Sequence, residues 1–320
     1  MRYLVTLTPL EPFLFGGDNT FGKIGDKDHG TYLVKSRQFP QQSAILGMLK
    51  KEIMTQSGTL TRKIRGEWVD KQKWHKANEL VGSEKFSMSD TTIQNFGAIE
   101  SIGALFLKQG EMSFIKKVNS DKYPYENGLL KNYNPKIDIY DNFVDIQSGK
   151  NLSSADIFIP IEQIGNKTGG ADNSLFKKTS YKLKGDFQFA FYLECTYELK
   201  SSIVSLGADG SSFKLELVKS NETLSYKDKH DHLTLISDSY ITLPIKEHCD
   251  FAITSEISFR TLINKKHATQ HNKFKKSHTL YLYEKGSIFI NPSELLIKNL
   301  NNLNCQKIGY NQHTYQKGQN

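Results

Sequence analysis

Hydrophobic residues near the start of the chain recur with the spacings of a strand and then of a helix. Residues 2–10 form a strand-like run. Ile45, Leu49 and Ile53 recur every four residues, so they predict the buried stripe of a helix. Pro40 suits the start of this helix, because the first turn does not need the N–H that proline lacks.

Further along the chain, alternating and continuous apolar runs predict more strands than helices. Residues 96–118 predict two strands around the turn Gln109-Gly110. Residues 187–198 are almost continuously aromatic or small and apolar, which indicates a strand buried on both faces. Residues 213–218 alternate as a half-buried antiparallel strand should. We also expect a helix over 68–81 anchored by Trp74 and strands at 240–243 and 251–253. Further on we expect a hairpin of 280–283 with 287–290, and a helix over 292–300 with Asn291 as its N-cap.

Two stretches interrupt this pattern. Residues 58–95 are polar and charged. In residues 119–155, tyrosines alternate with Asn, Lys and Asp with little periodicity. We interpret the second stretch as an insertion that projects from the first domain, and an ordinary irregular connection is the alternative. The mixture of antiparallel strands and intervening helices predicts an α+β chain, and 320 residues can hold two domains.

The composition favours a polyanionic partner. The formal net charge is +8, which suits nucleic acid better than a neutral metabolite, although basic proteins are common. Cys195, Cys249 and Cys305 are far apart, and an odd count without Cys-x-x-Cys argues against a disulfide framework or zinc ribbon. We find no apolar signal core and no apolar run near the roughly 20 residues that span a bilayer. We therefore expect a cytoplasmic protein with no membrane contact.

The first candidate binding site is the helix start together with the polar, glycine-rich loop before it. Free N–H groups and the positive dipole end of a helix suit a phosphate. Arg37 can hold a phosphate bidentately or stack on a base, and a surface salt bridge is the alternative. Gly47 costs the helix roughly 1 kcal/mol of stability relative to alanine. A helix accepts this cost more readily where another group must approach its backbone closely. The residues that can donate to phosphate or to an unstacked base are Gln41, Gln42 and Ser43.

Two other segments are candidates for contact with a polyanion. The stretch 264–278 holds five lysines and three histidines and no acid, so it would attract a phosphate backbone without reading bases. Its candidate contacts are Lys265, Lys266 and Lys273, and a solvated loop is the alternative. Gly207 and Gly210 permit a turn that could press against RNA, and a plain hairpin turn is equally compatible. No carboxylate or cysteine completes a metal site with the histidines, so we expect no metal and no cofactor.

The opening strand, the long loop and the helix with Phe39-Pro40, Ser43 and Gly47 resemble the opening of the RAMP superfamily of CRISPR proteins. Within it, the chain is most similar to the 5′-handle-binding subunits of type III-B (Cmr) effector complexes, and the type III-A (Csm) counterpart is the near alternative. Further stretches carry the resemblance by their order and spacing: 102–107 with 111–115, 162–165 with 175–177 and 187–193, 205–212, and 286–290 with 308–311.

The resemblance implies two ferredoxin-like (RRM-like) RAMP domains, 1–180 and 181–320, with insertions at about 58–95 and 119–155. The second insertion would act as a thumb or clamp over RNA. The implied function is that of a non-catalytic subunit in a type III RNA-guided antiviral ribonucleoprotein. This subunit would cap the 5′ handle of the crRNA, with phosphate contacts from Lys35, Arg37 and the helix start. It would dock the large polymerase-like subunit and the first backbone RAMP subunit, and would meet target RNA only indirectly.

An enzymatic alternative rests on His29 in the glycine-rich loop. RAMP-superfamily endonucleases often use a histidine in this region, and such a histidine can deprotonate a 2′-hydroxyl or protonate a leaving oxygen. Lys35 or Arg37 could stabilise the developing charge, whereas Asp26 and Asp28 would repel the phosphate. The alternative function is therefore a metal-independent endoribonuclease that processes CRISPR repeat RNA. A third hypothesis is a basic protein-interaction module with no RNA role.

Overall fold

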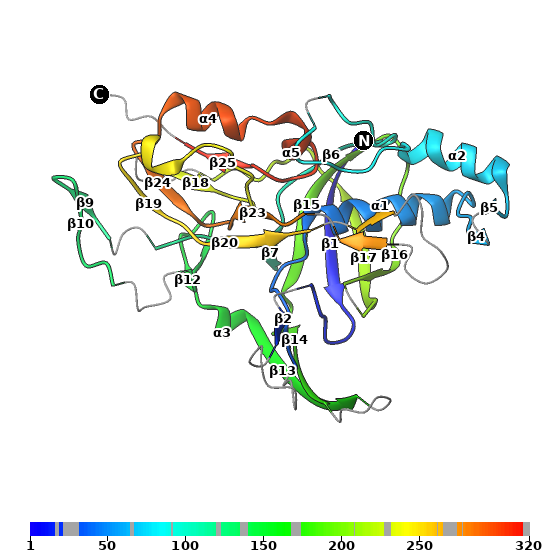
Figure 1. The fold of residues 1–320 in the computed structure, drawn as a ribbon, viewed down its shortest axis with the longest axis horizontal. Helices are drawn as coiled ribbons and strands as arrows, with labels where there is room; N and C mark the ends of the chain where they lie inside the picture. Colours follow the sequence, from blue (N-terminus) through cyan, green and yellow to red (C-terminus); the bar gives the residue numbers. More distant parts are fainter. Residues whose placement is uncertain are drawn as a thin grey trace. The chain divides into compact units, whose positions relative to one another are not determined.

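The computed structural model describes residues 1–16, 19–21, 32–64, 67–90, 92–119, 123–134, 140–167, 174–207, 209–226, 232–260, 262–264, 274–276 and 278–315. The described residues divide into two compact units (Figure 1). The first unit comprises Met1–Lys116, Asp141–Tyr226 and Leu303–Tyr310. The second comprises Lys117–Tyr140, Lys227–Asn302 and Asn311–Asn320.

A large antiparallel sheet forms the body of the first unit. Its strand order is β12-β11-β8-β7-β15-β1-β17-β16, with β6 also pairing with β15 (Figure 1). Strand β1 (Arg2–Pro9) lies between β15 (Gln188–Cys195) and β17 (Ser211–Lys219). The other strands are β6 (Ile99–Ile102), β7 (Phe106–Gln109), β8 (Met112–Lys116), β11 (Phe143–Asp145), β12 (Asn151–Leu152) and β16 (Ser202–Leu206).

This pairing differs from the domain boundary expected near residue 180. Both partners of β1 come after that position, so residues up to Tyr226 belong with the N-terminus. The expected insertion at 119–155 is also divided. Residues up to Tyr140 belong to the second unit, whereas β11 and β12 extend the large sheet through the pairing of β11 with β8.

The helices of the first unit follow the predicted apolar spacing. Helix α1 spans Gln42–Gln56, and the predicted stripe of Ile45, Leu49 and Ile53 is fully buried. Helix α2 (Lys71–Val81) confirms the helix predicted over 68–81, except that it begins at Lys71 because Trp68 belongs to strand β5 (Glu67–Trp68). Its N-cap is Asp70, whose carboxylate accepts from the backbone N–H of Lys73 at 2.9 Å. The short helix α5 spans Leu303–Lys307.

A second sheet in the same unit carries the longest hairpin of the described chain. Its order is β13-β14-β3-β2, and the β13–β14 ribbon extends away from the large sheet (Figure 1). Strand β14 pairs in parallel with β3, although the two are far apart in sequence. The bounds are β13 (Phe158–Lys167), β14 (Ser174–Leu183), β3 (Tyr32–Lys35) and β2 (Asn19–Phe21), with the short helix α3 (Ser154–Ile157) before β13.

Aromatic side chains join the two sheets of the first unit. The backbone of Phe13 pairs with that of Tyr181 in β14, with N–O distances of 2.8 and 3.0 Å. The Phe13 ring meets Phe189 of β15 edge-on, at 5.4 Å between centroids. Phe39 also packs edge-on against Phe189, at 5.6 Å. Aromatic contacts of this kind contribute roughly 0.5–1.5 kcal/mol beyond the area that they bury.

The second unit has its own apolar core. Its main sheet has the order β19-β24-β18-β25, made of Phe251–Ile253, Ile288–Ile290, His232–Leu235 and His313–Thr314. Leu233, Leu235 and Phe289 of this sheet pack with Leu296 and Leu300 of α4 (Glu294–Leu300). Short pairs of strands complete the described chain: β20 (Glu256–Phe259) with β23 (Leu280–Tyr283), β21 (Leu262–Asn264) with β22 (Phe274–Lys276), β9 (Tyr125–Glu126) with β10 (Leu129–Leu130), and, in the first unit, β4 (Lys63–Ile64) with β5 (Glu67–Trp68).

Several local predictions for the second unit were wrong. The strands at 280–283 and 288–290 exist but do not pair with each other, because β23 pairs with β20 and β24 pairs with β18 and β19. Residues 240–243 form no strand. The N-cap of α4 is Ser293, whose hydroxyl accepts from the N–H of Leu296 at 3.2 Å. Asn291 instead adopts a φ of 50° and donates to Asp250 at 2.7 Å.

The fold class is α+β, as predicted, whereas the division into two ferredoxin-like domains with a thumb remains a prediction. The hairpin of β7 and β8 around Gln109-Gly110 and the strand β19 are confirmed. In the part of the chain that the structure describes, no helix is long and apolar enough to span a membrane.

We predict that Gly309→Ala destabilises the first unit by about 2–4 kcal/mol. Gly309 has a φ of +87°, and a Cβ there would lie 2.5 Å from the Gly103 carbonyl oxygen and 2.5 Å from Gln42 Nε2. Left-handed strain costs roughly 1–2 kcal/mol, and displaced buried hydrogen bonds add about as much. Urea denaturation measures the loss. The control is Gly110→Ala, where φ is +55° but the space is open; equal losses would contradict the steric argument.

We predict that the contribution of Lys50 to the free energy of unfolding rises between pH 8 and 10. Burial lowers the pKa of Lys50 from 10.5 to about 8, while the Glu84 carboxylate raises it in part. Between these two values the Lys50 side chain binds more protons in the unfolded state than in the folded state, so its contribution to stability increases with pH. Lys50→Met should remove this gain in urea denaturation at pH 8, 9 and 10. Parallel pH profiles for the two proteins would contradict the assignment.

Candidate functional site

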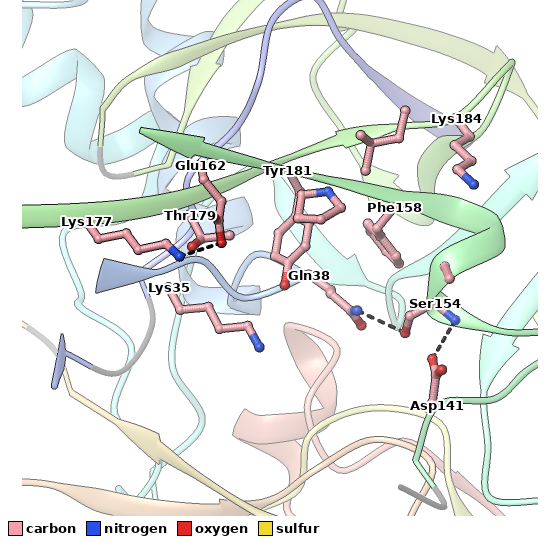
Figure 2. A pocket seen from close by; sticks show the side chains of 13 residues that line it. Lys35, Gln38, Asp141, Ser154, Phe158, Glu162, Lys177, Thr179, Tyr181 and Lys184 are labelled. Carbon is pink, nitrogen blue, oxygen red and sulfur yellow. Dashed lines mark hydrogen bonds and ion pairs between the residues drawn. The ribbon is translucent and has the colours of Figure 1, made fainter. Parts of the chain in front are cut away.

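A pocket of about 690 Å3 lies on one face of the second sheet (Figure 2). Along β13, Phe158, Pro160 and Glu162 point to the same side because strand residues alternate. Tyr181 and Thr179 of β14 stand directly opposite Pro160 and Glu162. The described residues that line the pocket are Lys35, Gln38, Asp141, Ser154, Ala155, Phe158, Ile159, Pro160, Glu162, Lys177, Thr179, Tyr181 and Lys184.

Lys35 and Gln38 reach this pocket from the connection between β3 and α1. A network of hydrogen bonds holds this connection in place. The hydroxyl of Ser36 accepts from the N–H of Phe15 at 2.8 Å and donates to the Arg37 carbonyl at 2.8 Å. The N–H of Ser36 donates to the carbonyl of Thr179 at 2.9 Å. Ser36 is buried, so these bonds are protected from water. The connection from β3 to α1 is thereby fixed against β14.

Aromatic rings form one wall of the pocket. Phe158 and Tyr181 are buried and meet edge-on, with 5.9 Å between their centroids. Burial raises the pKa of Tyr181, so its hydroxyl stays neutral. The wall is therefore apolar, and its rings are packed into the fold.

Polar side chains also line the pocket. Gln38 Nε2 donates to the hydroxyl of Ser154 at 2.9 Å, and Figure 2 shows Gln38 extending toward Ser154. The N–H of Ser154 donates to the carboxylate of Asp141. These amide, hydroxyl and carboxylate groups have the donors and acceptors needed to meet the edge of a base.

Lysines outnumber carboxylates around the pocket. Lys35, Lys177 and Lys184 line it, together with Glu162 and Asp141. Lys177 and Glu162 form a 2.8 Å ion pair, but their side chains are 42% and 58% exposed, so this pair contributes little and can open. The excess of cations over acids suits an anion such as a phosphate. Among the described lining residues there is no histidine or cysteine.

The start of α1 differs from the expected phosphate site. Gln42 is buried, and its Nε2 donates to the carbonyls of Gly103 at 3.2 Å and Gly309 at 3.1 Å. The N–H of Ser43 donates to the hydroxyl of Tyr310 at 3.3 Å, and the Tyr310 ring stacks on Phe86. The expectation that Gln42 contacts RNA is therefore wrong, because its side chain is a buried structural tie. The Ser43 N–H is likewise used in a hydrogen bond within the chain.

The other candidates of this region are half-buried or exposed. Arg37 is half-buried, and its backbone N–H donates to the Phe15 carbonyl oxygen at 3.3 Å. Gln41 is the N-cap of α1, but its side chain makes no capping bond. Gly47 lies on the exposed side of α1, and a Cβ there would meet nothing within 4 Å. No described part of the chain approaches Gly47 closely, so the glycine is not explained by internal packing.

Gly207 and Gly210 belong to the turn between β16 and β17. Gly207 has a φ of +99°, and its Cβ would lie 2.6 Å from the Leu14 carbonyl oxygen. The close approach of the Leu14 backbone therefore explains why position 207 is a glycine. Gly210 has a φ of +67° and open space around it. The turn is a hairpin connection, and its contact with RNA remains a prediction.

The remaining candidates lie outside the described residues. These are His29, Lys265, Lys266 and Lys273. Within the described ranges, no group of three or more His, Cys, Asp or Glu could hold a metal ion.

Sequence reasoning missed most of the pocket. Of its residues, it selected Lys35 alone and overlooked Gln38, Tyr181, Lys177 and Lys184. The density of lysines at 177–184 was the available signal. Their place beside Lys35 depends on the parallel pairing of β14 with β3, which has no local signature.

No family model and no curated protein matches the sequence. Among solved structures, this chain is similar to a chain of the type III-B Cmr-beta complex bound to cognate target RNA and AMPPnP. The TM-score is 0.54 and the sequence identity is 15%, and the match covers 98% of this chain and 96% of that chain. It is similar to a chain of Cmr-beta bound to cognate target RNA with the same TM-score and coverage and 16% identity. For the Csm3–Csm4 subcomplex of a type III-A complex, the TM-score is 0.38 at 12% identity, with coverage of 91% and 94%, which is too low to indicate a shared fold. The chain therefore shares its fold with these two Cmr-beta chains, and the resemblance had pointed to complexes of this type.

We predict that Gln42→Ala lowers the free energy of unfolding by about 2–4 kcal/mol, because two buried carbonyls lose their donor at roughly 1–3 kcal/mol each. The neighbouring Gln41→Ala is the control and should change stability by no more than about 0.5 kcal/mol. Urea denaturation compares the two. Similar small effects would return Gln42 to the set of candidate ligand contacts.

Proposed function

We propose that this chain is a non-catalytic RNA-binding subunit of a type III CRISPR effector complex. In this role it holds the 5′ handle of the crRNA and docks the large polymerase-like subunit and the first backbone subunit. The handle is single-stranded, so its phosphates and unstacked bases are open to side chains. The complex itself is a soluble ribonucleoprotein in the cytoplasm.

The observation that carries the proposal is the lysine-lined pocket on a type III-B-like fold. Lys35, Lys177 and Lys184 surround an aromatic wall of Phe158 and Tyr181. Lysines of this kind follow the phosphate backbone of single-stranded nucleic acid, and in the proposed complex the apolar wall lies beside its bases. Lys35 is the phosphate contact that the resemblance implied. Arg37, two residues along, and Gln41 lie on the same connection to α1 and extend the proposed contact.

The solved complexes with a similar chain add support of a different kind. Both are described as bound to cognate target RNA. A chain of the same fold thus works within an RNA-bound assembly. We extend that setting to this protein and assign the pocket to the handle.

The endoribonuclease alternative rests on His29 and can be separated by a simple assay. Repeat RNA incubated with purified protein in EDTA should be recovered intact. Discrete cleavage that disappears with His29→Ala would favour the alternative over the proposal, because a metal-independent mechanism needs such an acid–base group.

We predict that Lys35→Ala with Lys177→Ala weakens binding of a handle oligonucleotide at least about tenfold, since each lost charge-assisted phosphate contact contributes about 1.5 kcal/mol or more. The salt dependence should also flatten, with the slope of log K against log salt falling by about 1.4 for two phosphate contacts on a single strand. Fluorescence anisotropy at several salt concentrations measures both quantities.

The matched control is Lys246→Ala with Lys298→Ala, two exposed lysines of the second unit that lie outside the pocket. This control should leave affinity within about twofold, because isolated surface charges contribute little. Equal effects of the two double variants, or none from either, would remove the pocket from the proposed RNA site.

A further inference from the structure

Three polar residues of the pocket form one hydrogen-bonded group. Gln38 Nε2 donates to the Ser154 hydroxyl at 2.9 Å, and the Ser154 N–H donates to the Asp141 carboxylate. Figure 2 shows this group set apart from the ion pair of Lys177 with Glu162. The lysines of the pocket suit a phosphate, whereas a carboxylate repels one. The Gln38–Ser154–Asp141 group therefore suits a different part of a bound nucleotide, which is the base.

The Asp141 carboxylate is held in place and still has acceptor sites for a ligand. Its Oδ1 accepts from the N–H of Ser154. A carboxylate has about four lone-pair sites on its two oxygens, and this bond uses one of them. Asp141 is half-buried and lines the pocket. Its other sites can accept from N–H groups of a ligand, and partial burial strengthens such bonds relative to bulk water.

Gln38 adds a second acceptor to the same group. Because its Nε2 donates to Ser154, the amide is oriented and its Oε1 serves as the acceptor. Gln38 belongs to the connection between β3 and α1, which the Ser36 N–H ties to the Thr179 carbonyl. The acceptors are therefore positioned before a ligand arrives, which limits the entropy that binding must remove.

The four bases differ in the donors on their Watson–Crick edges. Guanine presents a ring N–H and an amino group side by side. Adenine and cytosine present one amino group beside a ring nitrogen that accepts, and uracil presents one N–H between two carbonyls. A carboxylate accepts two parallel hydrogen bonds from adjacent donors, and it repels an acceptor held in the same place. Of the four edges, that of guanine matches the Asp141 carboxylate.

We propose that this pocket reads a guanine base of the bound RNA through Asp141. The ring N–H and the amino group of guanine donate to the Asp141 carboxylate, and Gln38 Oε1 is a second acceptor for the amino group. The lysines of the pocket contact the adjoining phosphates. This inference rests on the proposed function, because it takes single-stranded RNA as the ligand. It goes beyond that proposal by assigning a base identity to the pocket and naming the residue that determines it.

Fluorescence anisotropy with the full chain and short labelled RNAs tests the base readout. The probes are an oligouridylate and the same RNA with one central guanosine, adenosine, cytidine or inosine. The guanosine probe should bind about tenfold more tightly than the oligouridylate, because charge-assisted hydrogen bonds contribute that much. Inosine keeps the ring N–H but lacks the amino group, so its probe should bind about threefold more weakly than the guanosine probe.

Asp141→Asn tests the assigned residue. It keeps an oxygen that can accept from Ser154 but replaces the other oxygen with a donor, so the guanosine and uridine probes should bind about equally well. The matched control is Asp186→Asn, since the Asp186 carboxylate accepts from Gln109 Nε2 at 2.9 Å in the same unit and outside the pocket. Both variants lose one negative charge, so the ratio of the two affinities separates base readout from general attraction. The control should keep the wild-type ratio.

Several outcomes would overturn the inference. They are equal binding of the guanosine and inosine probes, a preference for adenosine or cytidine, an unchanged ratio in Asp141→Asn, and an equal loss of the ratio in Asp186→Asn. The inosine comparison uses the wild-type chain, so it decides the matter even where circular dichroism shows that Asp141→Asn does not fold. Displacement of the guanosine probe by free guanosine monophosphate as effectively as by unlabelled RNA would assign the pocket to a free nucleotide.

The same probes separate this inference from the proposed function. A wild-type chain that binds all probes equally would overturn the guanine readout and leave RNA binding intact. A wild-type chain that binds none of them would overturn the proposed function, and the inference would fall with it.

Discussion

The double pairing of strand β1 is the constraint on which the first unit depends. Tyr3 stands opposite Leu193 on one edge and opposite Lys219 on the other, so both backbone edges of β1 are hydrogen-bonded. A strand paired on both edges leaves no backbone group without a partner in the core. The pairing brings residues 188–219 beside the N-terminus. It also places Phe13, just beyond β1, against the ring of Phe189. The backbone of Phe13 in turn pairs with that of Tyr181, and this pairing joins the large sheet to the second sheet.

That junction also explains why the pocket lies where it does. Tyr181 contributes its backbone to the junction and its ring to the pocket wall. Ser36 ties the β3–α1 connection to Thr179 of the same strand, which presents Lys35 and Gln38 to the pocket. The proposed RNA contacts are therefore attached to a packed framework, which preorganises them and limits the entropy that binding must remove.

The start of α1 shows how a feature suited to a ligand can be used by the fold. Its polar residues and open N–H groups have the chemistry of an anion site. In the structure, the segment Leu303–Tyr310 returns to this point, where the Gly309 carbonyl accepts from Gln42 and the Tyr310 hydroxyl accepts from Ser43. A residue type that can donate to phosphate can equally donate to a buried carbonyl, and only the distant segment distinguishes the two uses.

The sequence by itself determined the features that depend on local spacing. The stripe of Ile45, Leu49 and Ile53, the turn at Gln109-Gly110 and the α+β class follow from side-chain periodicity and turn chemistry. The order of its weak motifs also indicated the fold that the type III-B structures share. Only the tertiary structure decided that residues 181–226 belong with the N-terminus, that β23 and β24 pair with other strands, and that Lys177 and Lys184 stand beside Lys35. The physical reason is that strand pairing joins segments far apart in the chain, and the hydrogen bonds that select one partner over another leave no periodic signal in either segment.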